Sequence, residues 1–268
     1  MLTDMTDRRG VFRQAYGPVA VVVGASEGLG AAFSRELAAR GMDLLLLARR
    51  ATLLERLAGE IRSNHGVEVR CVPIDVAAPD LGLRIDEATR DLEIGTLVYN
   101  AAFAPVGPFL ERSDEALRRV AAVNMVGPML FVRRLAPAMC QRGRGAIVLM
   151  SSLAGFQGSP RIAAYAASKA FNTILAEGLW EELRGAGLDV VACCAGAIRT
   201  PNFAETSKGD APGTLDPTEV ARRTLDGLTR GPRIVPGLLN KIVALLDGRM
   251  LTRRAAIRLM AANTKDLS

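Results

Sequence analysis

Residues 18–30 read PVAVVVGASEGLG and run from an apolar segment through a glycine-rich turn into a helical pattern. The apolar residues at 18–24 predict a buried strand, and the periodicity of 29–41, which ends at a glycine, predicts a helix. Glycines between a strand and a helix allow a tight turn, and the backbone N–H groups of the helix N-terminus can hold a phosphate group. This stretch therefore predicts the first strand, turn and helix of an α/β nucleotide-binding fold.

The same alternation continues along the chain. Strands rich in Val, Leu and Ile that alternate with helices are typical of a parallel sheet covered by helices on both faces. We therefore expect an α/β fold, a Rossmann-type doubly wound parallel sheet of about seven strands in a single domain. The further strands are predicted at 43–49, 67–75, 95–102, 145–152 and 188–196, and the helices at 52–64, 83–92, 113–139 and 159–184.

The domain prediction covers the whole chain, 1–268, because no Pro-, Gly- or Ser-rich linker divides it. Residues 201–216 are polar and contain Gly and Pro at intervals, which is typical of a lid over a binding site. The expected parts are a cofactor half at 18–150, a catalytic and substrate half at 151–200, and a lid with C-terminal helices at 201–262, the helical patterns resuming at 217–230 and 238–262.

Composition excludes several classes of protein. The 49% hydrophobic content suffices for a large core, and the four cysteines form no C-x-x-C pair, so we expect a reduced, cytoplasmic protein. With one histidine, a His-built metal site is ruled out and no metal is expected. The first ten residues lack the apolar run of a secretion signal, and no apolar run approaches the roughly 20 residues of a membrane span.

The net charge of +6 raises the question of an acidic partner. The basic residues are scattered and no aromatic-rich basic stripe accompanies them, so no nucleic-acid partner is expected. Basic and apolar residues are interleaved over 238–262, a segment that could cover a pocket, pack in an oligomer or lie on an anionic membrane. We favour the first two and expect a small-molecule substrate and a homodimer or homotetramer.

The end of the second strand bears on the choice of cofactor. A site for NAD would place a carboxylate there to bond the ribose hydroxyls, but the chain has Ala48 followed by Arg49 and Arg50. A guanidinium suits a 2′-phosphate, so NADP(H) is the expected cofactor. The Glu27 carboxylate in the glycine-rich turn would repel a 2′-phosphate, so NAD(H) remains the alternative cofactor.

Several motifs occur in a fixed order along 18–200, and together they resemble the short-chain dehydrogenase/reductase family. They are Gly24-x-x-x-Gly28-x-Gly30, Asn100-Ala101-Ala102, Asn124, Ser151-Ser152 and Tyr165-x-x-x-Lys169. The resemblance implies that Tyr165 is the catalytic acid/base and Lys169 its partner. It also implies that Ser152, thirteen residues before the tyrosine, polarises the substrate carbonyl, and that Asn124 holds a water molecule in the proton relay.

The resemblance further implies a set of cofactor contacts, with Asp75 beside the adenine ring and the segment from Gly196 to Thr200 against the nicotinamide. Three positions depart from the family pattern, Val23, Ala102 and Ala195, and all three shape the loops rather than carry the chemistry. The expected cofactor-binding residues are Gly24, Ser26, Glu27, Gly28, Leu29, Gly30, Arg49, Arg50, Asp75, Val76, Asn100, Ala101, Ala102, Tyr165, Lys169, Ile198 and Thr200.

The spacing of the tyrosine and the lysine suits general acid–base catalysis. Residues at positions i and i+4 share a helix face, and a nearby ammonium favours the phenolate, so we expect Lys169 to lower the pKa of Tyr165. We also expect Gly127-Pro128 to distort the long helix beside Asn124 and free carbonyl groups there.

The expected function is that of an NADP(H)-dependent oxidoreductase that interconverts a carbonyl and a secondary alcohol by hydride transfer. A substrate of the 3-oxoacyl or steroid-like class, lipophilic in character, fits the apolar residues expected at the crevice, Phe103, Pro105, Phe109, Leu153, Phe156 and Phe203. The alternative is a non-catalytic NAD(P)-binding regulatory protein on the same fold.

Overall fold

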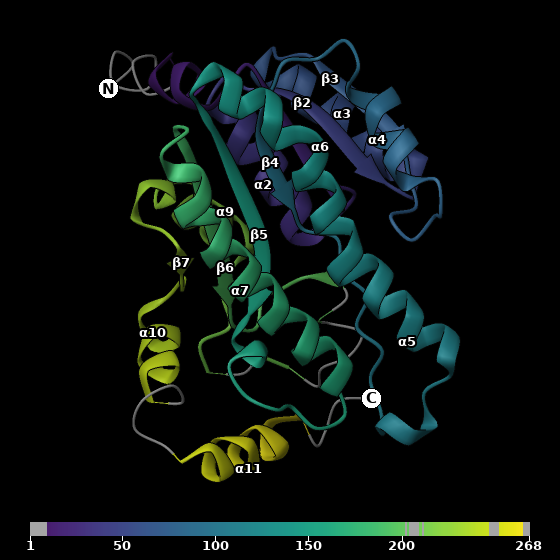
Figure 1. Cartoon of the computed structure of the whole chain (residues 1–268), viewed down its shortest axis with the longest axis vertical. Coiled ribbons are helices and arrows are strands. Elements are labelled where there is room, and N and C mark those ends of the chain that lie inside the picture. The colour runs from purple at the N-terminus through teal and green to yellow at the C-terminus, as the bar shows by residue number, and fades with distance from the viewer. Residues whose placement is uncertain (1–9, 202, 204–208, 211, 247–251, 265–268) are drawn as a thin grey trace.

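The structure is a computed structural model that describes residues 10–201, 203, 209–210, 212–246 and 252–264. The lid predicted at 201–216 therefore lies in part outside the described residues. Figure 1 shows one central sheet with helices on both sides, and α11 beyond the carboxyl ends of the central strands.

The sheet is parallel and has seven strands in the order β3-β2-β1-β4-β5-β6-β7, which confirms the predicted fold class. β7 has two residues, too few to leave a periodic pattern in the sequence, and it was not predicted. The strands are β1 Val19–Val23, β2 Asp43–Ala48, β3 Val69–Pro73, β4 Ile94–Tyr99, β5 Gly145–Ser152, β6 Leu188–Ala195 and β7 Arg233–Ile234.

The helices follow the strands in the predicted alternation. The pattern at 217–230 ends as a helix at Leu225 and continues in a short 3-10 turn, and the pattern at 238–262 gives two helices, α10 and α11. The helices are α2 Gly28–Ala39, α3 Ala51–His65, α4 Leu81–Thr89, α5 Asp114–Ala121, α6 Gly127–Arg142, α7 Ala163–Arg184, α9 Pro217–Leu225, α10 Leu238–Leu245 and α11 Arg253–Thr264.

Two apolar cores, one on each face of the sheet, account for the continuous apolar strands. Successive side chains of a strand point to opposite faces, so Ala20 and Val22 pack with α2, α3 and α9 while Val21 and Val23 pack with α4, α6 and α7. All five residues of β1 are buried. A strand covered on both sides has no position for a polar residue, which is why the pattern at 18–24 shows no alternation.

The strand order reverses beside β1, whose two neighbours are β2 and β4. The connections after β1 and after β4 therefore leave on opposite faces of the sheet and open a crevice at the carboxyl ends of these strands. The glycine-rich turn follows β1 directly and lies at this crevice.

The predicted helix at 113–139 is one continuous pattern, but the structure breaks it with a π-helical segment at Ala122–Val126, between α5 and α6. Pro128 has no N–H to donate to the carbonyl four residues before it, that of Asn124. The Gly127 N–H bonds the Ala122 carbonyl instead, and the Tyr99 hydroxyl donates to the Val123 carbonyl at 2.5 Å. The expected distortion beside Asn124 is confirmed.

Candidate active site

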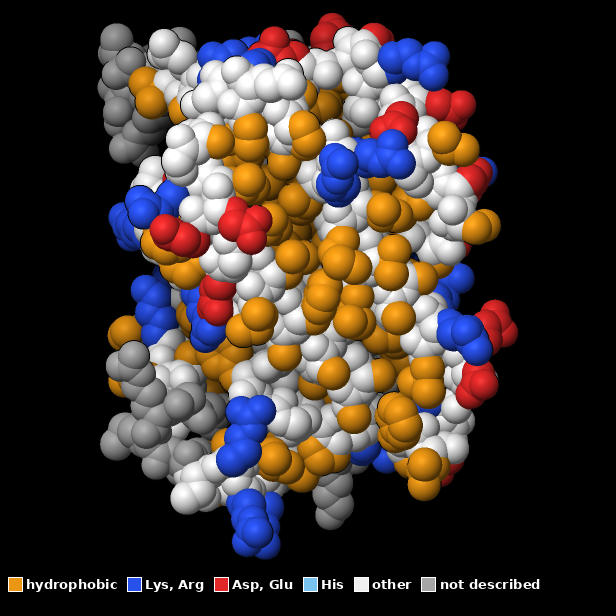
Figure 2. Space-filling view, in the orientation of Figure 1, with side chains coloured by type: hydrophobic (Ala, Val, Ile, Leu, Met, Phe, Trp, Pro, Cys, Tyr) orange, Lys and Arg blue, Asp and Glu red, His pale blue; other side chains and the backbone are white. Residues whose placement is uncertain are grey.

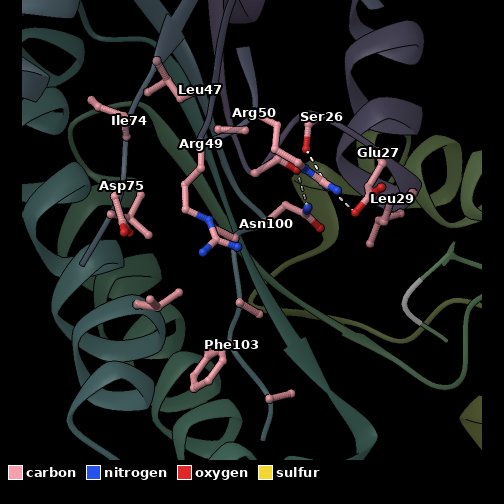
Figure 3. Close-up of a pocket in the computed structure, with 18 of the residues that line it drawn as sticks. Ser26, Glu27, Leu29, Leu47, Arg49, Arg50, Ile74, Asp75, Asn100 and Phe103 are labelled. Atoms are coloured by element: carbon pink, nitrogen blue, oxygen red, sulfur yellow. Dashed lines mark hydrogen bonds and ion pairs between the residues drawn. The ribbon is translucent and has the colours of Figure 1, made fainter. Parts of the chain in front are cut away.

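A cleft of about 370 Å³ opens at the carboxyl ends of β1, β2 and β4. Figure 3 shows its walls, with side chains from the glycine-rich turn, the end of β2 and the segments after β3 and β4. The predicted cofactor residues that line it are Gly24, Ser26, Glu27, Gly28, Leu29, Arg49, Arg50, Asp75, Val76, Asn100, Ala101, Ala102, Tyr165 and Thr200.

Two glycines shape the floor of the cleft. Gly24 has a φ of +82°, a conformation that side chains rarely allow. A Cβ at Gly30 would lie 2.0 Å from the Gly24 carbonyl oxygen, so Gly30 lets the first turn of α2 approach the end of β1 without lining the cleft itself. Asn100 Nδ2 donates to the same carbonyl at 3.0 Å and fixes the turn from the other side. The resulting cradle of backbone N–H groups at the N-terminus of α2 fits a pyrophosphate.

The charges at the end of β2 divide into one ion pair and one remaining cation. Arg50 is paired with Glu27 and also donates to Ser26 Oγ at 3.1 Å. Arg49 forms no salt bridge with any described residue, and Figure 3 shows its guanidinium between Asp75 and Asn100 inside the cleft. The Glu27 carboxylate, which opposes a 2′-phosphate, is thus neutralised by one arginine while the other stays available.

Asp75 is fixed at the end of β3 by a partner that the sequence did not indicate. Burial acts to raise the pKa of this carboxyl, but its bond from the Ala77 N–H and the charge of Arg119 outweigh burial and hold the pKa below its usual value. Arg119 Nη2 donates to Asp75 Oδ2 at 3.0 Å and stacks over the Phe103 ring at 5.8 Å. Arg119 therefore joins the segment after β3 to the segment after β4.

Ser152, Tyr165 and Lys169 come together where β5 ends and α7 begins. The hydroxyls of Ser152 and Tyr165 are hydrogen-bonded to each other, and Tyr165 lines the cleft. Lys169 Nζ lies 5.4 Å from the centre of the Tyr165 ring and donates to the Met150 carbonyl at 2.8 Å. The side chain of Lys169 is almost fully buried, with 3% of the residue exposed.

Burial shifts both titrating groups away from their charged forms. It lowers the pKa of Lys169 to about 8, and it raises the pKa of Tyr165, against the smaller lowering that the Ser152 bond provides. The expectation that Lys169 lowers the tyrosine pKa is wrong for this structure. The ammonium is turned to the Met150 carbonyl, and the loss of water contact dominates the tyrosine.

Two further polar residues of the motif set have structural partners. The Ser151 hydroxyl is buried and donates to the Lys169 carbonyl at 2.7 Å, so it holds α7 against β5 and faces away from the cleft. Asn124 is fully buried in the π-helical segment and bonds Phe103 and Ser168. Its side-chain amide is occupied by these bonds, and its carbonyl is the one that Pro128 leaves without an α-helical donor.

The segment expected against the nicotinamide is held by short backbone contacts. Ile198 forms an isolated parallel bridge with Leu215, and Thr200 lines the cleft where a Cβ on Gly28 would touch it at 3.0 Å. Ile198 itself packs against the apolar core on the α2 face. Five predicted site residues do not line this cleft. They are Gly30, Lys169 and Ile198 of the cofactor set and Asn124 and Ser152 of the catalytic set.

Several residues of the cleft were not predicted as cofactor contacts. Arg119 carries no local signal because its partner Asp75 is 44 residues away. Of the apolar residues expected at the substrate crevice, Phe103 lines the cleft, Phe156 packs against the core on the α7 face, and Phe109 is 53% exposed. The unpredicted cofactor-cleft residues are Leu47, Ala48, Ile74, Phe103, Ala104, Arg119, Val123 and Pro201.

In the part of the chain that the structure describes, His, Cys, Asp and Glu side chains nowhere gather in threes as a metal site. Among the described helices, none has the length and apolar character that crossing a membrane requires.

The cleft, the glycine cradle and the Ser152–Tyr165–Lys169 cluster agree with a match to a known family. The family model for short chain dehydrogenases matches residues 18–211. The chain belongs to the short chain dehydrogenase family. It is therefore an NAD(P)-dependent dehydrogenase/reductase, and the predicted enzyme class is confirmed.

Curated relatives cover most of the chain. A 7beta-hydroxysteroid dehydrogenase of Clostridium sardiniense is 32% identical over 86% of this chain and 89% of the relative. A very-long-chain 3-oxoacyl-CoA reductase of Anas platyrhynchos is 35% identical over 72% of this chain and 67% of the relative.

Solved structures share the fold over almost the whole chain. The structure of a 7beta-hydroxysteroid dehydrogenase matches with a TM-score of 0.88 and 29% identity, over 93% of this chain and 98% of that one. A short-chain dehydrogenase from Sphingobium yanoikuyae in complex with NADPH matches with a TM-score of 0.78 and 31% identity, over 87% and 94% of the two chains.

Proposed function

We propose that this enzyme uses NADP(H) to interconvert a bulky, lipophilic carbonyl compound and its secondary alcohol, with a steroid-like or 3-oxoacyl substrate. The observation that carries the proposal is the hydrogen-bonded Ser152–Tyr165 pair at the cleft, with Lys169 behind it. The similarity to hydroxysteroid dehydrogenases and 3-oxoacyl-CoA reductases supports this substrate class.

The site residues divide the chemistry of carbonyl reduction. When bound, the nicotinamide supplies the hydride that adds to the carbonyl carbon. The Ser152 hydroxyl donates a hydrogen bond to the carbonyl oxygen and stabilises the negative charge that develops there. The Tyr165 hydroxyl gives its proton to that oxygen as the alcohol forms, and it takes the proton back in the reverse reaction.

The remaining residues position these groups. Lys169 lies behind the Tyr165 ring, and its bond to the Met150 carbonyl holds this turn of α7 against β5. Asn124 fixes Phe103 and α7 on either side of the site, and the carbonyl that Pro128 frees is available to a water molecule of the proton relay. The glycine cradle holds the pyrophosphate at the N-terminus of α2.

The experiment on function follows NADPH absorbance with a panel of bulky ketones, steroid ketones and 3-oxoacyl thioesters beside small ketones. We expect turnover of the bulky members and a loss of at least a hundredfold in Tyr165→Phe. Tyr16→Phe is the matched control. The Tyr16 hydroxyl donates to Asp189 at 2.6 Å, and neither residue lines the cleft. Full activity in Tyr165→Phe contradicts the mechanism, and tight NADPH binding without turnover of any carbonyl or alcohol contradicts the enzymatic function.

The NADP(H) preference rests on Arg49, which forms no salt bridge with any described residue and whose charge acts on the nearby Asp75 carboxylate. We expect Arg49→Asp to shift the ratio of kcat/KM for NADPH over NADH towards NADH by at least tenfold, since a carboxylate repels the 2′-phosphate. Arg56→Asp, an exposed position of α3 with the same change of charge, should leave the ratio unchanged. An unchanged ratio in Arg49→Asp would mean that Arg49 does not select the cofactor.

Exposed apolar side chains on the face of α6 and α7 support self-association. Figure 2 shows apolar side chains across the centre of the face that carries α6 and α7, and Val126, Met129 and Ile174 are exposed there. We propose that this face forms a homodimer or homotetramer contact. Ile174→Glu should weaken this contact, and light scattering measures the change in mass.

All four cysteines are free, which supports a cytoplasmic location.

A further inference from the structure

A second hollow, of about 440 Å³, lies at the free edge of the sheet beside β7. It is as large as many small-molecule sites and shares no lining residue with the cofactor cleft. We call it the α9–β7 hollow. Its lining residues are Arg222, Arg223, Asp226, Gly227, Arg230, Arg233, Ile234, Val235, Pro236 and Lys241.

The charges of this hollow are unequal. Its lining contains five cationic side chains and one carboxylate, that of Asp226. The Asp226 carboxylate is shared, since Arg40 donates to Oδ1 at 2.6 Å and Arg222 donates to Oδ2 at 3.4 Å. Arg40 also pairs with Glu36 at 2.6 Å, so these two guanidinium groups have two carboxylates between them.

Two of the other cations have partners outside the hollow, and two have none. Arg223 pairs with Glu219 at 2.6 Å, and Arg233 pairs with Glu177 on α7. Arg230 and Lys241 form no salt bridge with any residue that the structure describes, and both are exposed. The six cations around the hollow, Arg40 included, thus face four carboxylates, those of Asp226, Glu36, Glu219 and Glu177, and two positive charges stay uncompensated.

This excess of positive charge favours an anion over a second copy of the chain as the occupant of the hollow. A second copy of the chain placed symmetrically over this edge would bring two uncompensated positive groups together, and like charges repel. An anion removes the excess instead. Guanidinium groups bind phosphate oxygens in a bidentate manner, and a lysine adds a point charge, so phosphate is the anion that these side chains suit.

We propose that the α9–β7 hollow binds a small molecule that carries at least two linked phosphate groups. The two unpaired cations come from separate elements, Arg230 from the 3-10 turn Leu228–Arg230 and Lys241 from α10, and a diphosphate offers each of them a phosphate group of its own. Figure 2 shows charged side chains gathered along the left margin at the height of β7, in contrast to the apolar centre of this face. The site is independent of the proposed function.

The experiment titrates inorganic pyrophosphate by calorimetry into the protein saturated with NADPH, at 50 mM and 150 mM salt. Saturation with NADPH fills the phosphate-binding turn of the cleft, so pyrophosphate reports the hollow alone. We expect binding of one pyrophosphate per chain that weakens at the higher salt, because exposed charges are screened. Orthophosphate should bind at least tenfold more weakly.

The variant Arg230→Glu/Lys241→Glu should lose pyrophosphate binding at least tenfold, and its exposed positions leave the fold intact. Arg56→Glu/Arg133→Glu changes the net charge equally at exposed positions outside the hollow and should retain binding. No pyrophosphate binding at 50 mM salt overturns the proposal, as does equal loss in both double variants. Orthophosphate binding as tight as that of pyrophosphate overturns the requirement for two phosphates.

Discussion

Asn124 holds the Phe103 peptide by both of its polar groups: its Oδ1 accepts from the Phe103 N–H at 2.8 Å, and its Nδ2 donates to the Phe103 carbonyl at 2.9 Å. The same Nδ2 donates to Ser168 Oγ at 2.9 Å. A single buried amide thereby joins the segment after β4 to α7, and so joins the cofactor cleft to the helix that carries Tyr165 and Lys169.

The first prediction concerns this amide. Asn124→Ala leaves the Phe103 groups without partners in a buried place, so we expect the free energy of unfolding to fall by about 1–3 kcal/mol. The KM for NADPH should rise as the segment after β4 loosens. Denaturant titration and steady-state kinetics measure the two effects. Asn172→Ala, on α7, is the control and should lose less stability. Among the described residues, Asn172 makes one side-chain hydrogen bond, a long one of 3.5 Å to the Met150 carbonyl.

The second prediction compares alanine substitutions at two glycines, one in α2 and one in α3. Gly30→Ala should abolish NADPH binding and destabilise the protein, because its Cβ would lie 2.0 Å from a backbone oxygen that cannot move freely. Gly59→Ala, in the exposed interior of α3 with no atom within 4 Å of the added Cβ, should raise the free energy of unfolding by about 0.5–1 kcal/mol. Equal effects at the two positions in fluorescence titration and denaturation would contradict the cradle geometry.

The order of strands and helices follows from local patterns, because each strand is covered on both sides and stays apolar throughout. The break beside Asn124 is also local, since Gly127-Pro128 removes a backbone donor. β7 could not be predicted from a local pattern. Its two residues form a strand because they pair with Ala192 and Cys193 at the edge of the sheet, about 40 residues away in the sequence.

The features of the site that the sequence did not predict also depend on contacts between distant segments. The motif residues are close in sequence to the elements that place them, whereas Arg119 reaches Asp75 across 44 residues and Glu27 meets Arg50 across 23. Charge pairing over such distances depends on how the helices pack. The direction of the Tyr165 pKa shift likewise depends on how much water the folded chain removes, and spacing alone does not fix that.

The third prediction compares two buried amides. Both polar atoms of Gln157 are buried without a hydrogen-bond partner among the described residues, whereas Asn240 Nδ2 donates to the Pro236 carbonyl at 3.0 Å and the Gly213 carbonyl at 3.2 Å. Gln157→Met should leave the free energy of unfolding unchanged or raise it by about 1 kcal/mol, and Asn240→Leu should lower it by about 1–3 kcal/mol. Equal losses in the two variants would show that the Gln157 amide has a partner.

The last prediction concerns pH and Lys169, whose pKa burial lowers to about 8. Below pH 8 the ammonium is charged in both states, and the full cost of burying it is present. Between pH 8 and the ordinary lysine pKa of about 10.4, the unfolded chain keeps a proton that the folded protein has lost. This group therefore makes the free energy of unfolding rise with pH, by at most about 1.4 kcal/mol per pH unit.

Other groups oppose this rise, so the test is a difference between variants. The pKa values of Cys71 and Cys193 are raised by burial, to about 11 and about 12, and above the ordinary thiol pKa they make stability fall with pH. The Cys71 contribution is present in the wild type and in Lys169→Met alike. The charge of Lys169 acts to lower the pKa of Cys193, so its removal adds to the fall of the variant's stability at high pH. The free energy of unfolding of Lys169→Met relative to wild type should therefore be most favourable below pH 8 and decline steadily towards pH 10. A difference that stays constant in urea titrations from pH 7 to pH 10 would mean that burial does not lower the pKa of Lys169.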